Sequence, residues 1–320
     1  MKTLVRGFAI ALALIVVLAA IGWLLLQRPD IPYATLEARY GYADSQYVDL
    51  PGGVRAHYRD VGPREAPAIV LIHGFAASTH AWDEWVKALS MDYRVVVLDL
   101  PGHGLTRTGV AYVVRPDGYE AVVDDLTRRL GLSRFTLVGN SMGGEVAWTY
   151  ALDHSDRVER LVLVDAAGWP TPGRGGGMIF KFLGNPIGRR VLKDIEIRPL
   201  MAQALRSAYV DPKLVTPALV ERYVDLARGP GHRDILLGQR PRRAATAADL
   251  ARIHVPTLIM FGQDDRLIPA ADGEQFHKAI PAATLILYPG VGHLPMEQIP
   301  QRSADDLKAW LAAHPAPAEP

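Results

Sequence analysis

The sequence predicts an α/β fold: a mostly parallel, twisted sheet flanked by helices, with an inserted helical cap and an N-terminal transmembrane helix. Three observations lead to this prediction. Short apolar runs alternate with amphipathic helical patterns over residues 46–167 and again over residues 246–314, as in sheets built from strand–helix–strand units. That alternation stops between residues 168 and 245. Residues 7–26 form a long apolar segment without a charge.

The composition limits what this chain can do. Its 320 residues are 49% hydrophobic and 22% charged, which is typical of a folded globular protein. The net charge of +1 offers no basic surplus, so we expect no nucleic-acid partner. Cysteine is absent, which excludes disulfides and a cysteine nucleophile. The 10 histidines lack paired ligand spacing, so we expect neither a metal site nor a cofactor.

Residues 1–28 are predicted to be a membrane anchor. The apolar segment covers about 30 Å as a helix, which matches the hydrocarbon core of a bilayer. Lys2 and Arg6 precede it, which favours a cytoplasmic N-terminus and an extracytoplasmic body. A cleaved signal peptide is one alternative, but the apolar run continues through Trp23 to Leu26, past the small residues that could be cut. A buried helix of a soluble protein is the other.

Residues 29–45 are predicted to be a linker with some helical content at residues 33–40, and the first part of the core follows over residues 46–167. A Pro-Gly-Gly turn at residues 51–53 predicts a hairpin. Apolar runs predict buried parallel strands at residues 68–72, 94–98, 135–138 and 161–164. Helical patterns occur at residues 82–89, 119–130 and 145–152. Right-handed crossovers would then bring His73, Ser141 and Asp165 to one sheet edge.

Residues 168–245 are predicted to form a helical cap inserted into the sheet domain, because they show no strand pattern. Helical patterns occur in this region around residues 179–183, 199–209 and 217–227. The second part of the core, residues 246–314, resumes the alternation, with strands at 257–261 and 284–288 and helices at 271–279 and 304–313. Residues 315–320 are predicted to be a frayed tail rich in Pro and Ala.

The stretch from residue 136 to residue 144 joins an apolar strand to a helix through the pattern G-x-S-x-G. Ser141 stands between Gly139 and Gly143. A serine on such a sharp turn exposes its hydroxyl, and flanking side chains would collide with neighbouring elements. The backbone N–H of Met142 can then face a developing oxyanion. A plain Gly/Ser turn is the alternative, but strand, turn and helix together favour a nucleophile.

A serine hydroxyl needs a base, and that base needs an orienting acid. His293 lies in a Gly-rich loop after one C-terminal strand, and Asp264 and Asp265 follow the strand before it. We therefore expect His293 to be the general base and Asp265 the acid, with Asp264 stabilising the turn. The N–H of Phe75 is expected to be the second oxyanion donor. The imidazole of His73 is expected to hold that loop by hydrogen bonds.

Five motifs in this order resemble the α/β-hydrolase superfamily across about residues 46–314. They are His73-Gly74-Phe75, Asp99-Leu100-Pro101-Gly102-His103-Gly104, Gly139-Asn140-Ser141-Met142-Gly143-Gly144, Gly262-Gln263-Asp264-Asp265-Arg266-Leu267-Ile268-Pro269 and Gly292-His293-Leu294-Pro295. The resemblance implies an α/β-hydrolase fold. It also implies the site residues: Ser141 as nucleophile, His293 as base, Asp265 as acid, and the N–H groups of Phe75 and Met142 as oxyanion hole.

The resemblance narrows the reaction without fixing it. Haloalkane dehalogenases and epoxide hydrolases of this fold carry an aspartate at the elbow, so Ser141 disfavours both. Residues 140–144 are similar to C–C hydrolases that cleave ring-fission products of aromatic degradation. Those enzymes carry Gly-Pro-Gly after the His-Gly, whereas residues 75–80 here are more similar to esterases and monoacyl-lipid lipases.

We therefore predict a membrane-anchored serine esterase or lipase acting on a small-molecule ester or lipid. A C–C bond hydrolase is the main alternative, followed by another acyl hydrolase or an acyltransferase on the same triad. A non-catalytic binding protein is less favoured, because Ser141, Asp265 and His293 are all present. The sequence specifies neither the acyl chain length nor an oligomeric state.

Overall fold

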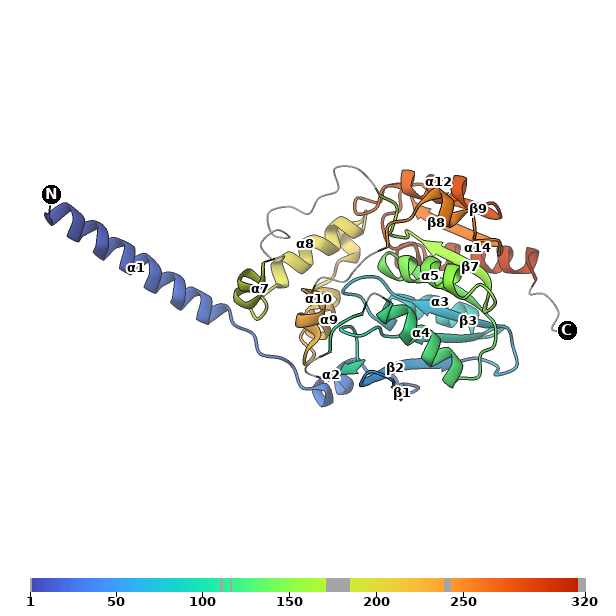
Figure 1. Ribbon diagram of the computed structural model, residues 1–320, viewed down its shortest axis with the longest axis horizontal. Coiled ribbons are helices and arrows are strands. Elements are labelled where there is room, and N and C mark those ends of the chain that lie inside the picture. Colours follow the sequence, from blue (N-terminus) through green and yellow to red (C-terminus); the bar gives the residue numbers. More distant parts are fainter. Residues whose placement is uncertain (1, 110–111, 116, 171–184, 239–242, 316–320) are drawn as a thin grey trace.

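The computed structural model describes most of the chain: residues 2–109, 112–115, 117–170, 185–238 and 243–315. The long helix α1 (Lys2–Leu26) projects away from a globular body (Figure 1). Within α1, residues Val5–Leu26 have a mean hydropathy of 2.9 and none of that stretch is buried. A helix of this length covers about 33 Å, enough to cross a bilayer. It is therefore a candidate membrane span.

The body contains a nine-stranded sheet within the described residues, and the predicted α/β architecture is confirmed. The spatial order is β1-β2-β4-β3-β6-β7-β8-β9, with β5 beside β2. In chain order the strands are β1 (Gln46–Leu50), β2 (Val54–Val61), β3 (Ala68–Ile72), β4 (Arg94–Leu98), β5 (Arg107–Thr108), β6 (Phe135–Asn140), β7 (Val158–Val164), β8 (Thr257–Gly262) and β9 (Ala283–Tyr288).

The sheet is parallel from β4 to β9, while β1, β2 and β5 add an antiparallel edge. Every residue of β3, β6 and β8 is buried, which explains their uninterrupted apolar sequences. Because these strands run in one direction, the loops that follow β3, β6, β7, β8 and β9 all leave from the same edge.

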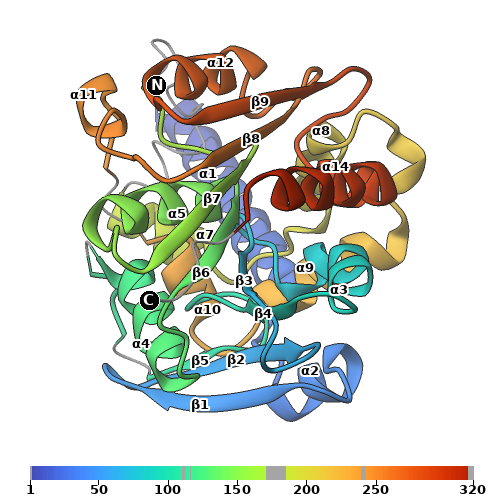
Figure 2. The same cartoon turned by 90° about the vertical axis from the view of Figure 1, so that its right-hand side faces the viewer.

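Helices cover both faces of the sheet (Figure 2). One apolar cluster joins the sheet to α4, α5 and α12, and a second joins the opposite face to α3 and α14. Trp82 and Trp85 belong to the second cluster, and both are fully buried. The helices of the body are η1 (Thr79–Trp82), α3 (Asp83–Leu89), α4 (Gly118–Arg129), α5 (Met142–Asp153), α11 (Ala247–Leu250), α12 (Ala270–Ala279), α13 (Pro295–Gln298) and α14 (Pro300–Ala313).

Between β7 and β8 the described chain is helical, as the sequence predicts for the cap. Its elements are α7 (Pro186–Leu192), α8 (Arg198–Ala208), η2 (Pro212–Leu214), α9 (Pro217–Ala227) and α10 (His232–Leu236). The helices predicted at residues 199–209 and 217–227 correspond to α8 and α9, whereas α7 and α10 were not predicted. The helix predicted at residues 179–183 lies outside the described residues.

The segment predicted to be a linker is packed against the body. It contains α2 (Tyr33–Tyr40), whose Leu36 is fully buried in a cluster with Leu105 and Leu226. Its backbone is also fastened to the cap, since Ile31 N–H donates to Arg228 O at 2.8 Å. Residues 29–45 thus hold the end of α1 against the body rather than act as a loose spacer.

Candidate active site

Ser141 lies on the sharp turn between β6 and α5, and its backbone is strained. Its φ of 55° and ψ of −118° are a conformation that L-residues rarely adopt. Neighbouring loops hold the turn, because Ser141 N–H donates to Val164 O at 3.0 Å and Ser141 O accepts from Ala167 N–H at 2.9 Å. The end of β7 therefore maintains the strained conformation.

The two glycines of the elbow are required by close backbone contacts. A Cβ atom on Gly139 would lie 2.1 Å from Gly143 O, and one on Gly143 would lie 2.3 Å from Ile72 O. Both obstacles are backbone atoms of packed elements, which cannot move aside. This explains why the pattern around Ser141 needs small residues at these two positions.

Two backbone N–H groups, those of Phe75 and Met142, belong to the segments that adjoin Ser141. A Cβ atom on Gly74 would lie 3.1 Å from the Cβ of Ser141, so the turn after β3 sits directly against the serine. Among the described residues, no acceptor is recorded for the N–H of Phe75 or that of Met142. Met142 is the first residue of α5, where N–H groups have no partner within the helix. The side chain of Phe75 is 57% exposed.

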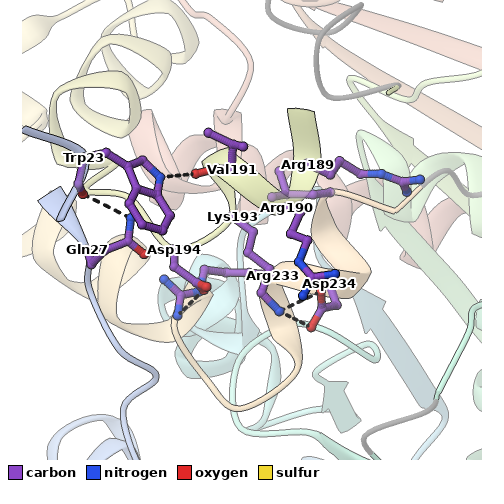
Figure 3. Close-up of a pocket in the computed structure, with 10 residues that line it drawn as sticks. Trp23, Gln27, Arg189, Arg190, Val191, Lys193, Asp194, Arg233 and Asp234 are labelled. Carbon is purple, nitrogen blue, oxygen red and sulfur yellow. Dashed lines mark hydrogen bonds and ion pairs between the residues drawn. The ribbon is translucent and has the colours of Figure 1, made fainter. Parts of the chain in front are cut away.

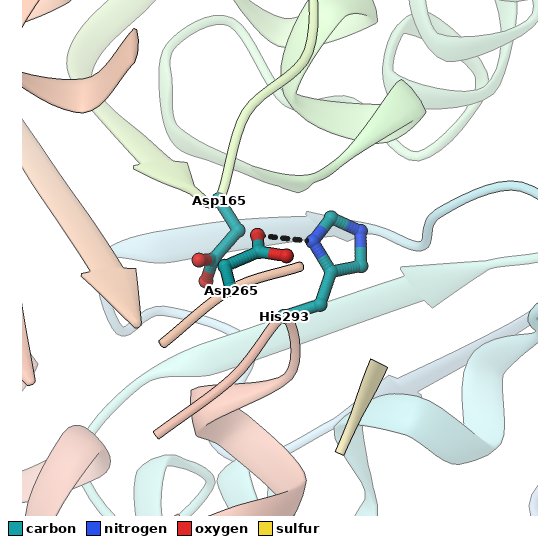
Figure 4. A group of neighbouring side chains, drawn as sticks. All are labelled: Asp165, Asp265 and His293. Atoms are coloured by element: carbon teal, nitrogen blue, oxygen red, sulfur yellow. Dashed lines mark hydrogen bonds and ion pairs between the residues drawn. The ribbon is translucent and has the colours of Figure 1, made fainter. Parts of the chain in front are cut away.

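His293 and Asp265 form a buried hydrogen-bonded pair. His293 Nδ1 donates to Asp265 Oδ2 over 2.7 Å (Figure 4), and both side chains are nearly inaccessible to solvent. The other oxygen of Asp265 accepts the N–H groups of Leu267 at 2.7 Å and Ile268 at 3.0 Å. Asp264 instead accepts the N–H of Gly290 at 2.8 Å. The histidine therefore contacts Asp265, and Asp264 stabilises the turn.

The His293 loop is tied to the serine elbow. Asn140, which precedes Ser141, donates its side-chain amide to His293 O at 3.2 Å. With Nδ1 of His293 donating to Asp265, Nε2 is left as an acceptor for a serine hydroxyl. No hydrogen bond between Ser141 and His293 is recorded among the described residues. Such catalytic hydrogen bonds are often long before substrate binds.

The same histidine loop is fastened to the cap. His293 N–H donates to Ala208 O at 2.8 Å, at the end of α8. The Tyr209 hydroxyl donates to Glu297 at 2.7 Å, and Val210 N–H donates to the side chain of Gln298 at 2.9 Å. Burial raises the pKa of Glu297 to about 7, against the opposing effects of its tyrosine partner and a nearby arginine. The cap and the loop carrying His293 are thus one hydrogen-bonded unit.

Asp165 joins this site, although its sequence context predicts only that it lies at the same sheet edge. It follows β7, has a φ of 43°, and accepts Gly262 N–H at 2.9 Å. Figure 4 shows its carboxyl group beside that of Asp265. Burial and the Asp265 charge raise the pKa of Asp165 well above its usual range. The raised pKa favours the protonated acid, and no hydrogen-bond partner is recorded for Asp165 Oδ2 among the described residues.

The ligand atoms of Asp165, Asp265 and His293 lie within 4.8 Å of one another, which is close enough to consider a metal ion. Their donor atoms are already engaged, however. The Nδ1 of His293 donates to Asp265, and Asp265 accepts two backbone N–H groups as well. A cation would have to displace these hydrogen bonds, so the three groups fit a hydrogen-bonded network better than a metal site.

His73 holds the turn after β3, which carries Gly74 and Phe75. Its Nδ1 donates to Gly74 O at 2.7 Å and its Nε2 accepts Leu100 N–H at 3.0 Å. Burial lowers the pKa of His73, which keeps the imidazole neutral and both nitrogens engaged. This geometry matches the role in holding the loop that the sequence predicts.

A second Ser-His-Asp chain lies elsewhere in the body. Ser45 Oγ is 2.8 Å from His57 Nε2, and His57 Nδ1 is 2.7 Å from Asp99 Oδ2. Ser45 also accepts the N–H of Tyr42 at 2.9 Å, and it does not sit on a strand-to-helix turn. No pair of free N–H groups is recorded next to it among the described residues. No sequence pattern points to this hydrogen-bonded group, because its members lie on three separate segments.

Comparisons with known proteins identify the family. A family model of the alpha/beta hydrolase fold matches residues 67–298. A curated relative, 2-hydroxy-6-oxo-6-phenylhexa-2,4-dienoate hydrolase of Burkholderia cepacia, is 28% identical over 254 residues, covering 75% of this chain and 85% of the relative.

Two solved structures extend this comparison. A membrane phospholipase A, reported as a bacterial virulence factor, superposes with a TM-score of 0.71 at 26% identity and covers 98% of this chain and 99% of its own. A thermophilic esterase of Thermogutta terrifontis reaches a TM-score of 0.71 at 25% identity, covering 85% of this chain and 100% of its own. The chain is a hydrolase that belongs to the α/β-hydrolase fold family.

Proposed function

We propose that this chain is a membrane-anchored serine hydrolase that cleaves carboxylic esters, with lipid esters as its substrate class. One observation carries the proposal. The strained turn of Ser141 and the buried His293–Asp265 pair leave the sheet from the same edge, with two unpaired N–H groups beside the serine. This combination suits nucleophilic attack on a carbonyl followed by stabilisation of the oxyanion.

In the proposed mechanism, Ser141 Oγ attacks the ester carbonyl while His293 Nε2 accepts its proton. Asp265 stabilises the imidazolium that forms. The N–H groups of Phe75 and Met142 hold the oxyanion, and each such donor is typically worth about 3–4 kcal/mol of transition-state stabilisation. The alcohol leaves with the proton from His293. A water molecule deprotonated by His293 then releases the carboxylic acid and restores the serine.

Asp165 is proposed to position Asp265 rather than to handle substrate. A protonated Asp165 donates to the Asp265 carboxylate, which fixes its orientation without adding a second charge. Asp265 then accepts from His293, from two backbone N–H groups and from Asp165. This set of donors keeps its carboxylate turned toward Nδ1 of the histidine.

The membrane anchor favours a lipid substrate. The apolar stretch Val5–Leu26 is exposed along its length, and the phospholipase A comparison covers 98% of this chain, so it includes this helix. We propose that residues 1–28 anchor the protein with the body outside the cytoplasm. A secreted protein released by signal cleavage is the alternative. The hydrogen bond from Trp23 Nε1 to Val191 O supports an anchor that is retained.

We propose the following division of the rest of the chain into domains. Residues 46–167 and 246–314 form the two parts of the hydrolase core, residues 168–245 the cap that shapes the substrate site, and residues 315–320 a tail. The contact between Ala208 and His293 supports a cap that acts together with the catalytic loop.

Hydrolysis assays with the full-length protein in neutral detergent test the function. p-Nitrophenyl esters of increasing acyl length and a diacyl phospholipid are offered to the wild type, to Ser141→Ala and to Ser45→Ala as matched control. We expect turnover by the wild type and the control, and background rates for Ser141→Ala. Inactivity of the wild type on every ester would refute the proposed substrate class.

C–C bond hydrolysis is the second candidate. It is favoured by the similarity of residues 140–144 to C–C hydrolases and by the Burkholderia cepacia relative. A ring-fission product, a dienoate with a 6-oxo group, is the discriminating substrate. Turnover of this compound together with inertness toward esters would replace the ester proposal. An acyltransferase would instead show product when an alcohol acceptor is added, and a pure binding protein would turn over neither substrate.

A further inference from the structure

A basic cavity lies where α1 meets the cap. It encloses about 820 Å³ and is lined by residues of α1, of α7 and the segment after it, and of α10 (Figure 3). None of its lining residues belongs to the loops that carry Ser141, Asp265 or His293. The cavity therefore has no part in the proposed ester hydrolysis.

The cavity is a built feature, because several hydrogen bonds hold α1 against the cap. Trp23 Nε1 donates to Val191 O at 2.8 Å. Arg28 N–H donates to Asp194 O at 2.6 Å, and Gln27 forms a β-bridge with Ile195. The end of the candidate membrane span is thus one wall of the cavity.

Four basic side chains line this cavity, Arg189, Arg190, Lys193 and Arg233, against two acidic ones, Asp194 and Asp234, and among the described residues two of the four basic groups are paired. Lys193 pairs with Asp234 at 2.9 Å, and Arg233 pairs with Asp194 at 3.1 Å. Arg233 is also bonded to the Asp30 carboxylate.

Two further arginines stand in the same wall. Among the described residues, neither Arg189 nor Arg190 has an acidic partner, although both line the cavity. In Figure 3, Arg190 extends to the same side as Lys193 and Asp234, while Arg189 extends away from Trp23. The cavity therefore presents a surplus of guanidinium charge to an anion.

The residues around the cavity are of the types found where a protein meets a membrane surface. The apolar stretch of α1 ends at Leu26, and Trp23 lies one turn before that end, where tryptophan is favoured at the bilayer interface. Apolar side chains of α7 are exposed next to it, with Ile187 75% and Val191 40% accessible. With α1 placed across a bilayer, a basic cavity at this end of the helix would lie level with the lipid phosphates.

We propose that this cavity binds the phosphate of an anionic phospholipid headgroup, at a site separate from the active site. The proposal rests on the membrane anchoring of the proposed function and does not depend on ester hydrolysis. A lipid source is favoured over a free phosphate, because Trp23, Ile187 and Val191 supply apolar contacts for the acyl region beside the charged groups.

Lipid binding to the full-length protein tests this assignment. The Ser141→Ala protein, which spares the lipid from hydrolysis, is titrated in neutral detergent and bound lipids are counted by native mass spectrometry. Phosphatidylglycerol is compared with phosphatidylcholine of identical acyl chains and with free glycerol phosphate. The same titration is made with Arg189→Gln/Arg190→Gln added. Arg129→Gln/Arg134→Gln, on exposed arginines of the body, is the control with the same change of charge.

We expect phosphatidylglycerol to bind more tightly than the other two ligands. An arginine near an anionic lipid surface contributes about fivefold, so the cavity variant weakens binding by up to about 30-fold while the control changes it little. Equal binding of the two lipids, or equal losses in both variants, would overturn the proposal. Free glycerol phosphate binding as tightly as the lipid would assign the cavity to a soluble phosphate instead.

The salt dependence of lipid binding tests the proposal even if the Arg189→Gln/Arg190→Gln variant fails to fold. Raising the ionic strength weakens phosphatidylglycerol binding to the Ser141→Ala protein if the guanidinium groups hold the phosphate. Binding that does not respond to salt contradicts the assignment. Ester hydrolysis is measured separately on protein with Ser141 intact, so failure of the lipid site and failure of the esterase proposal are distinguishable.

Discussion

Replacing Asp265 by asparagine tests whether its carboxylate sets the tautomer of His293. One oxygen of Asp265 accepts two backbone N–H groups, from Leu267 at 2.7 Å and Ile268 at 3.0 Å, and the other accepts Nδ1–H of His293 at 2.7 Å. In Asp265→Asn, the amide oxygen is needed for the two backbone donors. The amide NH₂ must then face His293 and donate to Nδ1, which places the imidazole proton on Nε2. That tautomer cannot accept the proton of Ser141.

The expected loss of kcat follows from the free energy needed to rotate the new side-chain amide by half a turn. Turning the amide restores the correct tautomer but leaves two buried backbone N–H groups facing an NH₂ group. Each unsatisfied group costs about 1–3 kcal/mol, so the competent orientation lies about 2–6 kcal/mol higher. Because about 1.4 kcal/mol is a factor of ten, we expect kcat to fall by about 30-fold to 10⁴-fold. KM should change little, because the substitution does not alter the substrate site.

The assay is steady-state hydrolysis of a p-nitrophenyl ester by the full-length protein, with a thermal melt as control for folding. Asp264→Asn is the matched variant, since that carboxylate contacts Gly290 N–H rather than the histidine. It should lose some stability and keep kcat within a few-fold. If the Asp265→Asn protein folds and retains wild-type kcat, the carboxylate of Asp265 does not orient His293 as proposed.

Two other substitutions address neighbouring carboxyl groups. Asp165→Asn should keep kcat within about threefold, because an amide can donate to Asp265 as a protonated acid does, whereas Asp165→Ala should lower kcat about tenfold through the lost hydrogen bond. Equal losses in the two variants would contradict a protonated Asp165. Glu297 has a pKa raised by burial to about 7, so the folded protein retains a proton that the unfolded chain releases above its ordinary value near 4.5. The wild type should therefore lose stability relative to Glu297→Gln as pH rises from about 4.5 to 7, and a melting-temperature difference independent of pH would contradict this assignment.

Much of the sheet could be predicted because burial on both faces leaves a plain signature. β3, β6 and β8 are buried at every residue, and each appears in the sequence as a short apolar run. The short cap helices gave no comparable signal. α7 begins with a side-chain cap from Asn185, and α10 has only five residues, held by ion pairs of Arg233. Helices of this length depend on tertiary contacts rather than on an apolar period.

Some residues of the candidate site could be predicted from local sequence patterns, and others could not. Ser141, Asp265 and His293 stand in local patterns, each directly after a strand, so they could be proposed from the sequence alone. Asp165 also follows a strand, but its contact with Asp265 exists because β7 and β8 are neighbours in the sheet. Strand order is a property of the whole fold. A lone aspartate therefore gave no indication of its partner 100 residues away.

The cap contacts depend on tertiary structure even more strongly. The hydrogen bond from His293 N–H to Ala208 O joins two loops through backbone atoms, which no residue type can reveal. The packing of residues 29–45 was missed for a similar reason. Leu36 is the one fully buried residue of α2, and the other residues of this short helix are partly or fully exposed, so the segment resembles a linker until the cap is placed beside it.

Site mapping with a fluorophosphonate probe tests the central claim most directly. The full-length protein is labelled in neutral detergent, digested and examined by peptide mass spectrometry, while ester hydrolysis is followed in parallel. The account predicts one adduct, on Ser141, with activity lost in proportion to labelling. Ser45→Ala should label normally and Ser141→Ala not at all. Ester hydrolysis that persists after Ser141 is fully labelled, or an adduct on Ser45 instead, would contradict the account.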